Sequence, residues 1–179
     1  MAKIGLKYLV AKPVTGAGSV IAKMIQADVS ISIAEVKLYA DDALSEMDAS
    51  FQNGSVSLGI DDLTAAIQVM LLGHTKDGTT DEITTNTDDN APFVGIGFYG
   101  AKVKDGVKAY RALFFPKVKF TEPSENMATK GEVLTFGTDT IVGTIFPDAI
   151  GDWKKEQTFP TELEAVTYLN TKAGIVVTP

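Results

Sequence analysis

A strand-like alternation of side chains is clearest in the stretch Val29-Ser30-Ile31-Ser32-Ile33-Ala34-Glu35-Val36-Lys37-Leu38. Apolar and polar side chains alternate along it with a period of two, and the apolar face switches near Ala34. Such a pattern predicts one long β-strand with a bulge. The alternation returns at Val56, Leu58 and Ile60, which predicts a second strand with one buried face and one solvent-exposed face.

An acidic segment, residues 41–50, joins these two strands. The strand pattern that reaches Ala43 breaks into an acidic stretch at residue 44 and resumes at Phe51, and Asn53-Gly54 predicts a tight turn before the second strand. The segment carries no catalytic chemistry, so we interpret it as an extended arm that contacts another copy of the chain. The candidate interface residues of this arm are Asp41, Asp42, Leu44, Glu46, Met47 and Asp48.

The composition indicates one globular domain spanning residues 1–179. Sixteen basic and 23 acidic side chains give a net charge of −7, and we expect no basic cluster of the kind that grips a nucleic-acid backbone. The chain has no cysteine, which excludes disulfides and thiolate metal ligands. No apolar stretch approaches the roughly 20 residues of a membrane-spanning helix, and the first residues lack the apolar core of a signal peptide. We therefore expect synthesis in the cytoplasm and no membrane segment.

Two helices are expected. The first follows Asp61-Asp62 and ends at Gly73, and the second begins at Thr161, which has capping-box spacing to Glu164, and ends before Gly174. The apolar face of the first helix comprises Leu63, Ala66, Ile67, Met70 and Leu71, and that of the second comprises Leu163, Ala165, Val166 and Leu169. The C-terminal tail, residues 171–179, contains the apolar run Ile175-Val176-Val177, which needs a partner.

Polar loops separate the remaining strands. Residues 74–91 are rich in Thr, Asp, Asn and Gly and predict a long exposed loop. Asp105-Gly106 predicts a hairpin between two strand-like segments, and a further strand pair is expected within residues 133–146. Acidic residues of these loops are candidates for a lumen or an inter-subunit contact, namely Asp77, Asp81, Glu82, Asp88, Asp89, Glu122 and Glu125.

Four features resemble chemical sites but have simpler explanations. The run Gly95-Ile96-Gly97-Phe98-Tyr99-Gly100 matches a dinucleotide-binding fingerprint, but no helix follows it, so we expect the glycines to permit close strand packing or a bulge. His74 lacks a second histidine or a cysteine for zinc and is expected to act at a helix end. The carboxylates of residues 77–90 lack the spacing of a calcium-binding EF-hand loop. Trp153 is expected to be a packing anchor rather than a sugar platform. We thus expect no catalytic residue, no cofactor and no metal site.

Several blocks of the chain, in order, resemble the major tail proteins of long-tailed phages and prophages of Gram-positive bacteria. The resemblance runs from the N-terminus to about Gly174. The blocks are Val36-Lys37-Leu38-Tyr39-Ala40-Asp41-Asp42, Leu58-Gly59-Ile60-Asp61-Asp62-Leu63, Leu71-Leu72-Gly73-His74, Ala91-Pro92-Phe93-Val94-Gly95-Ile96-Gly97-Phe98-Tyr99-Gly100, Tyr110-Arg111-Ala112, Lys117-Val118-Lys119-Phe120 and Thr129-Lys130-Gly131-Glu132.

The resemblance implies a fold and a role. The fold would be mainly β, a β-sandwich or barrel-like tail tube domain with one flanking helix and a second helix near the C-terminus. The role would be that of a structural, non-enzymatic subunit of the virion tail, assembled in the host cytoplasm, whose hexameric rings stack into a tube that DNA traverses without specific binding. Its partners would be other copies of itself, the tape measure protein, and the tail terminator and baseplate proteins. No additional C-terminal immunoglobulin-like domain is expected.

Two other classes of protein remain open from the residues alone. A monomeric β-sandwich module that binds a ligand such as a carbohydrate would have the same strand pattern. An acidic hydrolase would use a pair of carboxylates, but nothing in the sequence selects a pair. A module would stay monomeric at rising concentration, and a hydrolase would lose activity on substitution of one carboxylate.

Overall fold

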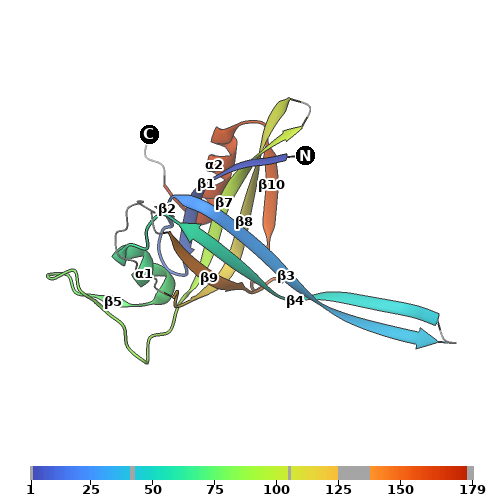
Figure 1. The fold of residues 1–179 in the computed structure, drawn as a ribbon, viewed down its shortest axis with the longest axis horizontal. Coiled ribbons are helices and arrows are strands. Elements are labelled where there is room, and N and C mark those ends of the chain that lie inside the picture. The colour runs from blue at the N-terminus through green and yellow to red at the C-terminus, as the bar shows by residue number, and fades with distance from the viewer. Residues whose placement is uncertain (1, 41–42, 105, 125–137, 177–179) are drawn as a thin grey trace, which may run out of the picture.

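A computed structural model describes residues 2–40, 43–104, 106–124 and 138–176 of the chain, which form a mainly β protein with two helices (Figure 1). All strand pairs are antiparallel. The main sheet contains β1 (Ala2–Pro13), β2 (Ser19–Ala22), β3 (Met24–Ala40), β4 (Ala43–Ile60), β7 (Phe93–Lys104), β8 (Val107–Thr121), β9 (Asp139–Ile145) and β10 (Lys155–Phe159). Two short strands, β5 (Thr75–Lys76) and β6 (Ile83–Thr84), pair separately. The mainly β expectation is confirmed.

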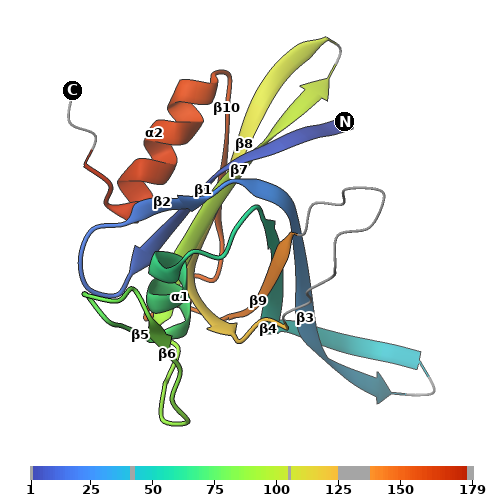
Figure 2. The same cartoon turned by 60° about the vertical axis from the view of Figure 1, so that its left-hand side comes forward.

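The sheet curls into a barrel because its two end strands, β2 and β3, are consecutive in the chain. The strand order is β2-β1-β7-β8-β9-β4-β3, and β10 pairs with the first half of β8. Only Lys23 separates β2, which pairs with β1, from β3, which pairs with β4. The Lys23 amide donates to the Asp61 carboxylate at 3.0 Å, and the Asp61 amide donates to the Lys23 carbonyl at 3.1 Å. These bonds fix the corner at which the barrel closes (Figure 2).

The interior of the barrel is the main hydrophobic core. Inward-facing residues of the strands pack in one cluster, in which Leu58, Ile96, Phe115 and Val118 are fully buried. Phe115 and Val118 both point inward because the pairing of β7 with β8 shifts register between them. Helix α1 (Ala65–Leu72) adds Ile67, Leu71 and Leu72 to this cluster.

A second apolar layer lies on the outer face of β1, β7 and β8, under helix α2 (Glu162–Ala173). Strand β7 is therefore buried on both faces. A Cβ at Gly97 would lie 2.8 Å from a ring atom of Phe114 and 2.9 Å from a methyl of Leu169. The glycines of the 95–100 run thus permit close packing of strand, ring and helix, as expected, and the run continues as a strand instead of turning into a helix.

Hydrogen bonds from tyrosines hold α2 in place. The Tyr8 hydroxyl donates to the Asn170 side-chain oxygen at 2.8 Å, and the Tyr99 hydroxyl donates to the Glu162 carboxylate. Burial raises the pKa of Tyr99, and the bond from Tyr99 lowers the pKa of Glu162, so the donor stays protonated and the acceptor stays charged at neutral pH.

Both helices confirm the sequence expectations. α1 ends at Gly73 and α2 at Gly174, each in the left-handed conformation. Thr161 and Glu164 make both bonds of the capping box. Two members of the predicted apolar faces are wrong, because Ala66 of α1 is exposed and Leu163, on the outer side of α2, is 74% exposed.

Three expectations about strands are wrong. Residues 43–50 are not a break between strands but the first part of β4, paired with β3 throughout. Asn53-Gly54 is not a turn, because Gly54 lies inside β4 between Ile31 and Ile145. The predicted polar loop contains a small hairpin, β5 and β6. By contrast, the bulge expected near Ala34 is confirmed by a register shift between Ser32 and Ile33.

Two further differences concern the C-terminal half. Strand β10 has no sequence signal, since its residues are mostly polar. Of the strand pair expected within residues 133–146, β9 is present, and residues 133–136 lie outside the described residues.

Replacing Ile67, which is 3% exposed, by Asp should prevent cooperative folding, because an unpaired carboxylate would enter the barrel core. We expect a loss of roughly 4 kcal/mol or more in the free energy of unfolding, measured by denaturant titration. The control is Val69→Asp on the same helix, where the residue is 37% exposed and the loss should stay below about 1 kcal/mol. Equal stability of the two variants would mean that the predicted core face is not core.

Gly97→Ala should lower the free energy of unfolding by about 1–3 kcal/mol, because the new methyl overlaps Phe114 and Leu169. Gly78→Ala is the matched control, since a Cβ there meets no atom within 4 Å. Thermal melting of the two variants beside the parent protein measures the difference. An unchanged melting temperature for Gly97→Ala would contradict close packing of α2 on β7.

Candidate assembly surfaces

The outer halves of β3 and β4 form a two-stranded ribbon that projects from the barrel (Figure 1). We call this ribbon, residues 33–40 and 43–51, the arm. Its pairs run from Ile33 opposite Phe51 to Ala40 opposite Ala43. Eight extended residues at about 3.3 Å each give the arm a reach of about 26 Å.

The arm contains the described part of the predicted interface. Leu44, Glu46, Met47 and Asp48 lie in β4, opposite Tyr39, Leu38, Lys37 and Val36 respectively. Asp41 and Asp42 lie outside the described residues.

No third strand supports the arm within the part of the chain that the structure describes. The pairing of β4 with β9 ends at Gly54, just where the arm begins. An isolated two-stranded ribbon is marginally stable in water, because it buries little apolar surface. The arm is therefore an element that gains stability when another surface covers it.

The polar loop, residues 74–91, is organised by its own carboxylates. Asp77 accepts hydrogen bonds from the amides of Thr79 and Thr80 at 2.7 and 3.0 Å, and these bonds lower its pKa. Asp81 pairs with Lys76 at 2.7 Å, which lowers the pKa of Asp81. Both carboxylates are exposed and stay charged at neutral pH.

Three further predicted acids, Glu82, Asp88 and Asp89, lie in the same loop. Glu82 and Asp88 are exposed, and Asp89 accepts a bond from the Asn86 amide at 2.9 Å. Glu125 lies outside the described residues.

His74 joins the polar loop to the end of β8. Its Nε2 lies 3.0 Å from a carboxylate oxygen of Glu122. The histidine side chain is 3% exposed and that of Glu122 is 61% exposed. The Nδ1 atom of His74 is buried and has no hydrogen-bond partner among the described residues. The residue follows the C-terminal end of α1, as expected, but it contacts a carboxylate of another element, which the sequence did not predict.

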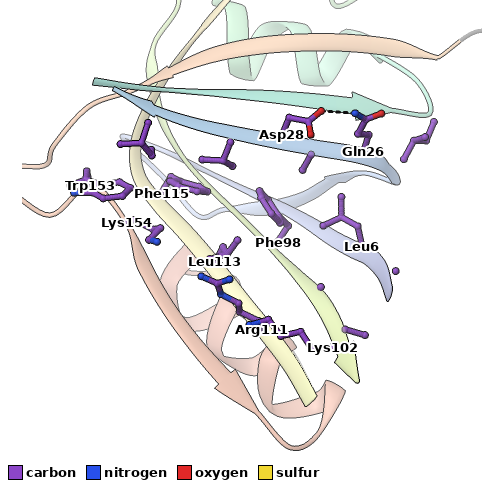
Figure 3. A pocket seen from close by; sticks show the side chains of 17 residues that line it. Leu6, Gln26, Asp28, Phe98, Lys102, Arg111, Leu113, Phe115, Trp153 and Lys154 are labelled. Carbon is purple, nitrogen blue, oxygen red and sulfur yellow. Dashed lines mark hydrogen bonds between the residues drawn. The ribbon is translucent and has the colours of Figure 1, made fainter. Parts of the chain in front are cut away.

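An open cleft of about 670 Å³ lies between β3 and the strands β1, β7 and β8 (Figure 3). Phe98, Leu113 and Phe115 line its interior, and Ile25 and Val29 contribute apolar surface from β3, with exposed fractions of 53% and 38%. Large apolar residues exposed together on a folded subunit indicate a surface that a partner covers.

The rim of the cleft near β10 is built from ion pairs and a ring stack. Arg111 and Lys154 both pair with Glu156, whose pKa is lowered by these bonds. Trp153 stacks on Phe51 with ring centroids 4.8 Å apart. The prediction of a packing anchor is confirmed, and one face of the indole is not available to a sugar.

A second hollow, of about 520 Å³, lies on the outer face where β1, β8 and β10 meet the end of α2. We call it the lysine groove, because Lys12, Lys117, Lys155 and Lys172 line it and Asp148 is the one acid among its described lining residues. The expectation of no basic cluster is therefore wrong. No local pattern could reveal this cluster, because each lysine comes from a different element.

The described residues contain no group of three or more histidines or acids that could hold a metal ion. Among the same residues, no helix has the length and apolarity needed to cross a membrane.

Comparison with known proteins gives the family. The family model of the phage tail tube protein matches residues 18–164, which include every strand from β2 to β10. No curated protein matches the chain. Since the family model covers most of the chain, this mainly β protein with its projecting arm belongs to the phage tail tube protein family, the structural proteins of a virion tail.

Proposed function

We propose that this chain is the major subunit of a phage tail tube, in which hexameric rings stack into a conduit for DNA. The observation that carries the proposal is the arm, a ribbon about 26 Å long that no other described strand supports. The described buried residues of the barrel core all lie outside the arm, and Phe51 at the base of the arm packs against this core. A ribbon that projects from the barrel and buries little apolar surface in the free subunit is explained by a contact between copies.

Contacts within a ring would use different surfaces from contacts between rings. Head-to-tail association of identical subunits joins two unlike surfaces and closes into a ring when the rotation allows. The open cleft, with Ile25 and Val29 exposed, supplies an apolar surface for a neighbour in the ring, and the arm supplies the contact to the next ring. The number six comes from the resemblance to the family.

The acidic charge of the chain fits a conduit for DNA. Basic side chains bind phosphates by releasing counterions, so a lumen lined with carboxylates lets DNA slide. Asp77, Asp81, Glu82, Asp88 and Glu122 are described acids of the loops that would line the bore, and the lowered pKa values of Asp77 and Asp81 keep these two charged. The tape measure, tail terminator and baseplate proteins would be the other partners.

Removal of the arm should abolish tube growth without unfolding the subunit. Glu35 and Ala49 are register partners, so replacing residues 36–48 by an Asn-Gly turn keeps the hairpin closed at its base. We expect no species larger than a single ring at any concentration by sedimentation velocity, with a melting temperature close to that of the unassembled parent. If the shortened protein forms tubes as the parent does, the arm is not the stacking element. A parent protein that itself stays monomeric would favour a monomeric binding module.

Assembled tubes should show no measurable affinity for duplex DNA even at 0.01 M salt, where the screening length is roughly 30 Å and any exposed basic surface would be most adhesive. Titration of labelled duplex against tubes at low and moderate salt measures this. Binding that weakens steeply with salt would mean that a positive surface faces the DNA.

A further inference from the structure

The lysine groove is formed by closely packed residues on the outer face of the sheet. Gly95 forms part of its lining, and Phe114 lies so close that a Cβ at position 95 would come within 2.9 Å of the ring. Its volume of about 520 Å³ can accept several side chains of a partner. Pockets that bind ligands commonly measure roughly 300–1,000 Å³.

Among the described residues, three of the four amino groups around this groove have no paired carboxylate. Lys155 pairs with Asp152 at 3.2 Å and with Asp148 at 4.0 Å. Lys12, Lys117 and Lys172 form no ion pair with a described residue. Like charges that share a groove repel one another, and an anionic partner relieves this repulsion.

Aromatic rings hold two of these lysines. Lys117 lies over the Phe93 ring at 4.4 Å from its centroid, and Lys172 lies over the Tyr168 ring at 5.4 Å. Such cation–π contacts restrict the two side chains and keep their charges near the groove.

The arm has the charge that complements this groove. Residues 33–51 comprise the arm and the two residues that join its strands. By sequence they contain one lysine, Lys37, and five acids, namely Glu35, Asp41, Asp42, Glu46 and Asp48. A second acidic segment is the polar loop, in which Asp77, Asp81 and Asp89 make bonds within the loop. The arm differs from this loop because it projects from the barrel as a ribbon with no third described strand beside it.

The groove that receives an arm belongs to another copy. The arm continues β3 and β4 outward from the barrel (Figures 1 and 2), so it cannot return to its own α2 while both strands stay paired. We propose that the lysine groove is the receptor for the acidic arm of a neighbouring copy. This inference rests on the proposed function, because it names the surface on which the stacking arm docks.

Charge reversal in both partners tests the contact. The groove variant carries Lys12→Glu and Lys172→Glu, and the arm variant carries Glu46→Lys and Asp48→Lys. Each should raise the concentration needed for tube assembly by about tenfold or more, because attraction becomes repulsion at two positions. The combined chain with all four substitutions should recover assembly, since arm and groove are again opposite in charge. Lys108→Glu, at an exposed position outside the groove, is the control and should assemble like the parent.

The outcomes separate this inference from the proposed function. If the groove variant assembles normally while the arm-shortened chain does not, the arm stacks on some other surface and the inference is wrong. If neither change affects assembly, the arm is not the stacking element and the inference is wrong, whereas a parent chain that never assembles would overturn the proposed function itself. Melting curves establish that each variant is folded, and failure of the combined chain to recover, with each pair folded, also overturns the inference. Binding of duplex DNA by parent tubes that the groove variant loses would make the groove a nucleic-acid site instead.

Discussion

Closure of the barrel at Lys23 is the constraint on which the rest of the structure depends. One nearly continuous stretch of chain pairs with β1 through β2 and with β4 through β3, and the two hydrogen bonds between Lys23 and Asp61 hold the corner between them. Without this corner the sheet would have two open ends and no enclosed core. The strand that closes the barrel also continues outward as half of the arm.

The same closure explains why the molecule has two apolar layers. Strands β1, β7 and β8 lie with one face toward the barrel interior and the other under α2, so glycines and small residues are needed where helix and sheet approach. Where α2 ends, the outer face of the sheet is no longer covered, and the lysine groove lies there. The arm and the groove are thus both products of how the barrel is closed and covered.

Local signals in the sequence predicted the parts of the fold that depend on near neighbours. The period of two, the bulge near Ala34, both helices and the capping box at Thr161 are set by residues a few positions apart. The strand at residues 43–50 was missed, because acidic residues disfavour strands and here pairing with β3 compensates. Gly54 was taken for a turn, but it is a glycine because Ile31 and Ile145 occupy the space of a side chain. The lysine groove and the contact of His74 with Glu122 join elements far apart in the chain, and no local pattern encodes them.

Electron microscopy of the concentrated full-length protein tests the central claim most directly. A tube subunit with a docking arm should form hollow filaments of stacked rings, with each arm extending from one ring onto the next. The account is supported if averaged images show such rings with a central channel. Single globular particles at every concentration, or filaments without a channel, would contradict it.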